Sequence, residues 1–147
     1  MNTSSRLPLE AFPSQSFDKI RYGDTDRQGH VNNAVFSTYL ETGRVELMFA
    51  SELPLMSEKN SFVIASLNLQ LLAEINWPGK VDIGTGVMSV GNSSMRLLQG
   101  VFQDGQCVAT AETVIVQVDN RTRKSDRLSD QARRSLSKYL LDSDLVE

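Results

Sequence analysis

The chain contains few of the residues that build disulfides and metal clusters. Its 147 residues include one cysteine, Cys107, and one histidine, His30. A single cysteine excludes an internal disulfide, and this pair alone is too small a set for the usual zinc sites. We therefore expect no metal, no cofactor and a reducing compartment, the cytoplasm, with Cys107 packed as a small apolar side chain.

Long apolar runs and basic runs are absent as well. Glycine, proline or charge interrupts each apolar stretch before the roughly 18 residues that span a bilayer. Residues 1–16 are polar and contain prolines, without the apolar centre of a signal peptide. The net charge is −3, and no basic run provides the footprint of a nucleic-acid binder. We expect neither a membrane nor a nucleic acid as partner.

The overall amino-acid composition is typical of one globular domain. Hydrophobic residues make up 40% of the chain and charged residues 22%. We expect a single domain over residues 1–147, with residues 1–16 as a polar N-terminal tail and residues 125–147 as a C-terminal helix and tail.

A short strand, a polar turn and a long helix are predicted in the first third of the chain. Residues Phe17–Tyr22 alternate like a strand, and the apolar residues of Asn33–Ala50 recur at helical spacing. Asn32 or Asn33 is suited to cap that helix. Gly43 costs up to roughly 1 kcal/mol of helix propensity relative to alanine, so we expect the helix to lie close against a sheet there.

Four further strands alternate with turns before a final helix that starts at Ser129. They are predicted over Phe62–Leu72, Val81–Val87, a stretch from about Met95, and Cys107–Val118. Consecutive hairpins produce an antiparallel sheet, so the fold class is α+β. Because the first strand is short and the last is apolar on both faces, we expect two copies to pair, as a homodimer or a dimer of dimers.

The densest polar chemistry lies between the first strand and the long helix. Residues 21–33 read RYGDTDRQGHVNN, and Tyr39, Glu41 and Arg44 follow on the helix. This pattern resembles the signature of hotdog-fold acyl-CoA thioesterases, most closely the 4-hydroxybenzoyl-CoA thioesterase and YbgC-like branch, over roughly residues 17–124. The resemblance implies a sheet wrapped around a long central helix, and hydrolysis of an acyl-CoA or acyl carrier protein thioester.

The expected catalytic residues of this segment are Asp26, Asn33 and His30. The family has a carboxylate at the position of Asp26, which acts as nucleophile or as general base, and the sequence leaves both roles open. Amides near Val31 to Asn33, with the Asn33 N–H first among them, would hold the oxyanion at the helix start. Asp24, between glycine and threonine, is expected to bond its own turn.

His30 has three possible roles: to orient water, to bind the substrate carbonyl, or to support the structure. The segment also resembles plant acyl-ACP thioesterases, which have Asp, Asn and His at the positions of Asp26, Gln28 and His30, but Gln28 departs from that triad. The expected substrate-binding positions are Gly29, Val31, Asn32, Asn68, Ser93, Arg121 and Arg123. The two arginines belong to a basic loop that either meets the phosphates of coenzyme A or is simply solvated.

The sequence leaves two alternatives to a thioesterase open, and it predicts one ion pair on the long helix. A hotdog module that binds an acyl-CoA or acyl carrier protein without cleaving it is the first alternative to a thioesterase. A hotdog hydratase or dehydratase is the second, although His30 in HVNN matches such enzymes poorly. Glu41 and Arg44, three residues apart, are expected to form an ion pair along the helix.

Overall fold

The computed structural model describes residues 7–49, 55, 57–142 and 144. Its helices and strands follow in the order β1 (Ser14–Lys19), α1 (Asn33–Phe49), β2 (Asn60–Leu71), β3 (Lys80–Val90), β4 (Ser94–Gln103), β5 (Gln106–Asp119) and α2 (Asp130–Ser137). Ala50, the last residue of the predicted long helix, lies outside the described residues. None of the described helices combines the length and apolarity needed to cross a membrane.

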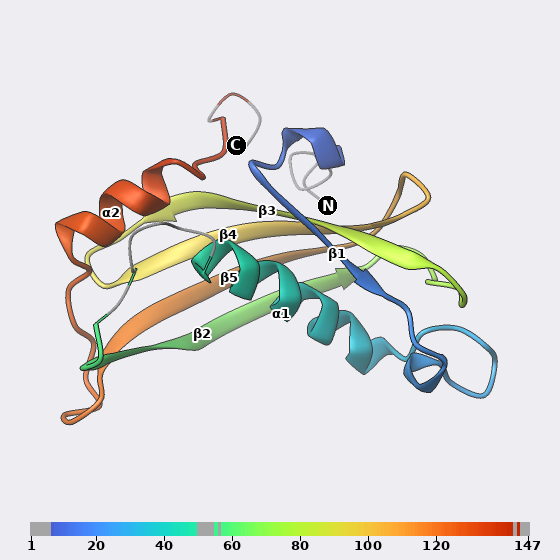
Figure 1. Ribbon diagram of the computed structural model, residues 1–147, viewed down its shortest axis with the longest axis horizontal. Helices are drawn as coiled ribbons and strands as arrows, with labels where there is room; N and C mark the ends of the chain where they lie inside the picture. Colours follow the sequence, from blue (N-terminus) through green and yellow to red (C-terminus); the bar gives the residue numbers. More distant parts are fainter. Residues whose placement is uncertain (1–6, 50–54, 56, 143, 145–147) are drawn as a thin grey trace.

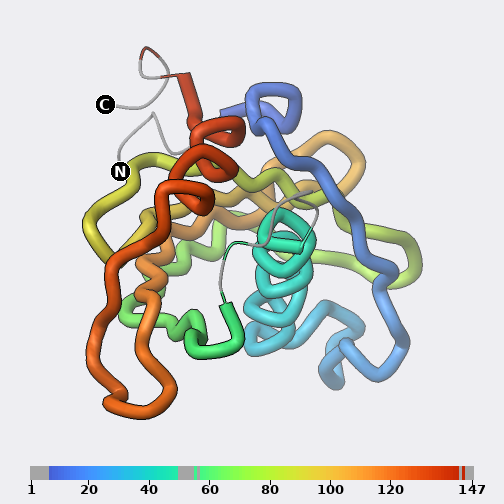
Figure 2. Tube along the Cα trace, turned by 60° about the vertical axis from the view of Figure 1, so that its left-hand side comes forward, coloured from blue at the N-terminus to red at the C-terminus, as the bar shows by residue number. Residues whose placement is uncertain are grey.

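The five strands form one antiparallel sheet in the order β1-β3-β4-β5-β2. Helix α1 runs across one face of this sheet (Figure 1). In the rotated view of Figure 2 the strands curve around α1, and α2 lies toward one end of the sheet. The predicted α+β architecture, a sheet wrapped around a long helix, is confirmed.

Gly43 allows α1 to approach the sheet closely. A Cβ atom at this position would come within 2.6 Å of Ile83 Cγ2 and 2.8 Å of Thr85 Oγ1. These distances are shorter than normal van der Waals contacts, so only glycine fits here without displacing the sheet. The close packing predicted from the sequence is confirmed.

Arg44 faces the sheet and does not pair with Glu41, so the predicted helical ion pair is wrong. The Arg44 side chain is buried, and its Nη1 donates to Gln99 Oε1 at 3.3 Å. Gln99 Nε2 in turn donates to Leu40 O at 2.9 Å and to Thr85 Oγ1 at 3.0 Å. Burial lowers the pKa of Arg44, and the negative charge of Glu41 opposes this shift more weakly.

The N-terminal segment is packed from residue 7 onward, which corrects the predicted tail of residues 1–16. Leu7 and Phe12 are buried, and the Phe12 ring lies on the face of the sheet opposite α1, where Gly84 and Gly100 leave room for it. Strand β1 starts at Ser14 because residues 14–19 pair with Lys80–Thr85 of β3. Because prolines interrupt the segment, its apolar residues follow no regular spacing that would predict their packing.

The first strand also ends earlier than predicted. Tyr22–Asp24 form a short 3₁₀ helix, closed by hydrogen bonds from Asp24 N to Arg21 O at 2.9 Å and from Thr25 N to Tyr22 O at 3.1 Å. The Asp24 carboxylate accepts the Arg21 N–H at 2.9 Å and so turns the chain out of the extended conformation.

Both ends of the described chain pair with the edge of β3 that faces away from β4. Beyond the pairing with β1, Val87 of β3 accepts from Leu141 N at 2.9 Å and donates to Tyr139 O at 2.8 Å. Leu141 also packs against Gly86 on the face that holds Phe12. Helix α2 leads into this segment. Ser129, where the helix was predicted to start, is its N-cap, and its Oγ accepts from Ala132 N at 3.0 Å.

Strand β2 is the outer strand on the opposite side of the sheet, and among the described strands it pairs with β5 alone. Its middle residues are exposed on both faces. The large apolar side chains exposed along it are Val63, Ile64, Leu67 and Leu71.

Candidate functional site

The loop that carries Asp26 is closed by hydrogen bonds onto the aspartate itself. Asp26 Oδ1 accepts from Gln28 N at 2.8 Å and from His30 N at 3.3 Å. The Asp26 N–H donates to His30 O at 2.8 Å, and Gly29 N donates to Asp26 O at 3.1 Å. Gly29 has φ of +84°, a left-handed conformation that glycine adopts readily. The loop therefore fixes one carboxylate oxygen of Asp26.

The same loop is attached to the segment that follows β2. Thr25 and Val31 form an antiparallel bridge within the loop, and His30 forms another with Asn76. The Val31 N–H donates to Ile75 O at 2.9 Å, and its side chain is buried in the core. Val31 thus anchors the loop through its backbone and its buried side chain.

The start of α1 leaves one amide free beside this loop. Asn32 caps the helix, since its Oδ1 accepts from Ala34 N at 3.0 Å. The Asn32 N–H donates to Asp24 O at 2.8 Å. Asn33 is the first residue of α1, and its N–H has no acceptor in the part of the chain that the structure describes. Of the three amides expected to form an oxyanion hole, only that of Asn33 is unengaged.

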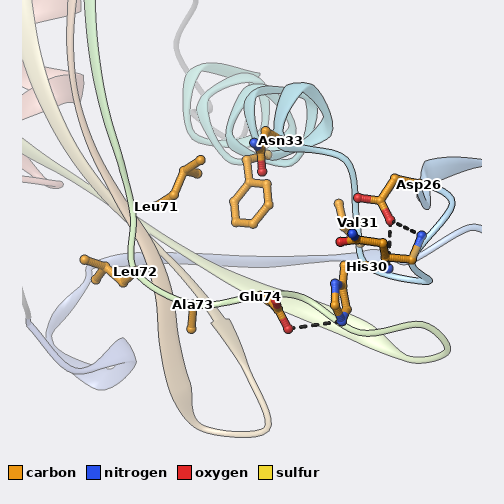
Figure 3. Close-up of a pocket in the computed structure, with 10 residues that line it drawn as sticks. Asp26, His30, Val31, Asn33, Leu71, Leu72, Ala73 and Glu74 are labelled. Atoms are coloured by element: carbon orange, nitrogen blue, oxygen red, sulfur yellow. Dashed lines mark hydrogen bonds and ion pairs between the residues drawn. The ribbon is translucent and has the colours of Figure 1, made fainter.

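These elements enclose a crevice of about 350 Å³. The loop and the start of α1 form one side, and the end of β2 with the residues after it forms the other (Figure 3). The lining residues are Asp26, Gln28, His30, Val31, Asn33, Phe36, Leu71, Leu72, Ala73 and Glu74. The three expected catalytic residues, Asp26, His30 and Asn33, therefore meet at one crevice.

The two aspartates of the DTD sequence have different environments. Asp26 is exposed, and its Oδ2 accepts no hydrogen bond from any described residue. Asp24 is buried and accepts from the Tyr39 hydroxyl at 2.8 Å, with Arg21 Nε at 3.7 Å. Burial, and then the hydrogen bond to Asp24, raise the pKa of Tyr39 well above its usual range. The predicted structural role of Asp24 is confirmed.

Several expected substrate-binding residues do not reach the crevice within one chain. Asn68 is exposed on β2 but does not line it. Ser93 lies in the turn between β3 and β4, where its carbonyl accepts from Gln117 N at 2.8 Å. Arg121 and Arg123 follow β5, whose last residue, Asp119, pairs with Asn60 at the end of β2 opposite Leu71 and the crevice. Arg121 there lines a second cavity of about 360 Å³, together with Lys59, Asp119 and Asn120.

Glu74 is a site residue that the sequence analysis did not identify. Its Oε2 lies 3.1 Å from His30 Nε2, and both side chains line the crevice (Figure 3). A single glutamate after a strand carries no sequence signal, because only the pairing of the two segments brings it to His30. Within the described residues, no three His, Cys, Asp or Glu side chains gather in a way that could hold a metal ion.

Comparison with known families agrees with this architecture. A family model described as the thioesterase-like superfamily matches residues 20–136. The chain belongs to this superfamily. It is a hotdog-fold thioesterase of the YbgC-like kind and a thioester hydrolase, as the resemblance implied. This assignment favours hydrolysis over the binding-module and hydratase alternatives.

Individual relatives of the thioesterase are similar over most of its length. It is 28% identical over 120 residues to the uncharacterized protein YsmA of Bacillus subtilis, covering 80% of each chain. It is 26% identical over 105 residues to the acyl-CoA thioester hydrolase YbgC of Escherichia coli O6:H1, covering 69% of this chain and 78% of that one. It also matches the structure of a Thermus thermophilus thioesterase complexed with coenzyme A and zinc. The TM-score is 0.77 at 26% identity, over 87% of this chain and 94% of that one.

Proposed function

We propose that the protein hydrolyses an acyl-CoA thioester to a carboxylic acid and free coenzyme A in the crevice beside Asp26. One observation carries this proposal: the unengaged Oδ2 of Asp26 and the unengaged N–H of Asn33 belong to residues that line the same crevice. Hydrolysis of a thioester needs one group that attacks or activates water, and one that stabilises the oxyanion. The name of YbgC and the coenzyme A bound to the Thermus thioesterase support the substrate class.

The Asn33 amide is the proposed oxyanion donor. The neighbouring amides of Val31 and Asn32 already donate to Ile75 O and Asp24 O, so neither is available to a substrate. Asn33 opens a helix of 17 residues, whose positive end favours a developing negative charge. One such donor contributes about 3 kcal/mol to transition-state stabilisation in known enzymes.

Asp26 is the proposed catalytic carboxylate, and two routes fit its geometry. As a nucleophile, Oδ2 bonds to the acyl carbon while the C–S bond breaks, and water then hydrolyses the mixed anhydride. As a general base, Oδ2 takes a proton from the attacking water and the leaving sulfur receives it. Both routes yield the acid and the thiol without a cofactor. The two N–H groups that hold Oδ1 orient Oδ2 in either case.

A second copy of the chain would bring the expected phosphate-binding arginines to the crevice. Antiparallel pairing of two β2 strands across a two-fold axis places the Asn60 end of one copy beside the Leu71 end of the other. Lys59 and Arg121 of one copy would then lie beside the crevice of the other, since Lys59 directly precedes β2 and shares a cavity with Arg121. We therefore propose a homodimer in which Arg121 and Arg123 contact coenzyme A phosphates bound mainly by the partner.

Hydrolysis of a panel of short, long and aromatic acyl-CoAs, followed by detection of the released thiol, tests the function. Asp26→Asn preserves the size of the side chain but removes its charge and basicity, so turnover should fall at least about 100-fold. Asp130→Asn removes the same charge from an exposed position on α2 and should leave turnover unchanged. Near-complete activity of the Asp26→Asn protein would exclude Asp26 from the mechanism.

A further inference from the structure

Glu74 and His30 form a carboxylate–imidazole pair in the wall of the crevice. The Glu74 Oε2 atom lies 3.1 Å from His30 Nε2 (Figure 3). Both residues line the same crevice as Asp26 and Asn33. The other ring nitrogen of His30, Nδ1, is not engaged by any hydrogen bond to a described residue.

The backbone fixes this pair more than the attraction of its charges does. His30 bridges to Asn76, and Val31 N donates to Ile75 O, so the loop and the segment after β2 are paired on both sides of the contact. The side chains are 31% and 66% exposed for His30 and Glu74. Ion pairs with such exposure contribute little to stability. The contact therefore matters for the orientation of the His30 ring more than for the stability of the fold.

The contact favours one position of the proton on the His30 ring. In a neutral imidazole one nitrogen is a donor and the other an acceptor. A carboxylate oxygen 3.1 Å from Nε2 favours the proton on that nitrogen, which leaves Nδ1 as an acceptor. An acceptor binds the O–H of a water molecule but not the carbonyl oxygen of a thioester. Of the roles open to His30, this favours the orientation of water.

We propose that Glu74 is a positioning residue that holds His30 in the Nε2–H tautomer, so that His30 Nδ1 accepts a hydrogen bond from the water that attacks the acyl carbon. This inference rests on the proposed thioester hydrolysis. The Asn33 amide stabilises the oxyanion, Asp26 provides the catalytic carboxylate, and His30 aligns the water. Glu74 acts only through His30.

The tautomer is measured directly, because His30 is the sole histidine of the chain. The imidazole ¹⁵N signals of the labelled protein then come from one residue, and they are recorded at about pH 8.5, where an ordinary imidazole is neutral. The wild type should show the Nε2–H form. Glu74→Ala should shift the signals toward a mixture of tautomers, whereas Glu74→Gln, whose amide oxygen accepts the same bond, should preserve them. Wild-type signals in Glu74→Ala would overturn the proposal.

Kinetics test whether the tautomer matters for turnover. Glu74→Ala should lower kcat about tenfold with little change in KM, since a carboxylate that orients a catalytic imidazole has effects of this size or larger. Glu74→Gln should restore most of that loss. Glu46→Ala removes an exposed carboxylate on α1 and serves as the matched control with wild-type kcat. In a His30→Ala background, Glu74→Ala should cause no further loss.

Two kinetic outcomes also contradict the proposal: wild-type kcat in Glu74→Ala, or an equal loss of kcat when His30 is already alanine. Failure of the proposed function looks different. In that case the wild type itself hydrolyses no acyl thioester, while the ¹⁵N spectra still report whether Glu74 fixes the His30 tautomer.

Discussion

The Tyr39 hydroxyl donates a hydrogen bond of 2.8 Å to the buried carboxylate of Asp24. This contact connects the middle of α1 to the 3₁₀ turn that precedes the Asp26 loop. Asp24 also accepts the Arg21 N–H and, through its carbonyl, the Asn32 N–H. One aspartate of the DTD sequence therefore holds the loop, and the other, Asp26, is the proposed catalytic carboxylate.

This contact predicts a loss of stability in alkaline solution. Burial and the bond to Asp24 raise the pKa of Tyr39 in the folded protein above its unfolded value of about 10. The stabilising contribution is complete below about pH 10 and is lost as pH rises toward the folded pKa. The free energy of unfolding in urea should therefore decline above about pH 10, and Tyr39→Phe should remove this part of the decline. An unchanged pH dependence in Tyr39→Phe would contradict the assignment.

Proline at position 33 tests the oxyanion donor without removing the helix. Proline is well accepted at the first position of a helix, and the capping residue before it is normally extended. Asn33→Pro should lower kcat about 100- to 1,000-fold, as expected for the loss of one oxyanion donor. Asn33→Ala keeps the amide and should retain kcat within a few-fold. Thermal unfolding by circular dichroism checks that both variants are folded; full activity of Asn33→Pro would remove this amide from the mechanism.

Alanine at Gly43 should destabilise the protein although it favours the helix. The added Cβ would collide with Ile83 and Thr85 on the sheet. Overpacking of this kind costs about 1–3 kcal/mol, more than the roughly 1 kcal/mol gained in helix propensity. Thr38→Ala, at an exposed position of α1, should change the free energy of unfolding by less than about 0.5 kcal/mol. Urea unfolding of both variants distinguishes close packing from propensity.

Lysine on the exposed border strand should weaken the proposed dimer. Leu67 on β2 is 39% exposed, and Val45 on α1 is 40% exposed, so the two positions are matched in accessibility. Leu67→Lys places a charge where two β2 strands would meet and should lower the molar mass measured by light scattering toward that of one chain. Val45→Lys should leave it unchanged. Equal effects of the two substitutions would argue against pairing through β2.

Local patterns in the sequence predicted much of this molecule. The apolar spacing from Asn33 marks α1, and the tight turns separate the strands as the structure has them. The glycine at position 43 signalled close packing because nothing else explains its place inside a helix. The clustered loop residues Asp26, His30 and Asn33 meet at one crevice because they are close in sequence as well as in space.

Features that depend on distant pairing were not predictable in this way. Glu74 reaches His30 only because the segment after β2 pairs with the Asp26 loop. The spacing of Arg44 from Glu41 is that of a surface ion pair, but its place on the sheet side of α1 directs it to Gln99. Phe12 packs on a recess made by two glycines of different strands, which no local pattern in a proline-rich segment reveals.

The two outer strands of the described sheet differ in what they present to a second copy. Strand β1 is 6 residues long, and beyond it residues 139–141 bond to Val87 of β3. Strand β2 presents 12 residues along its outer edge. In the proposed dimer each β2 edge pairs with the other across the two-fold axis, so a third copy finds no β2 edge to join and this contact is self-limiting.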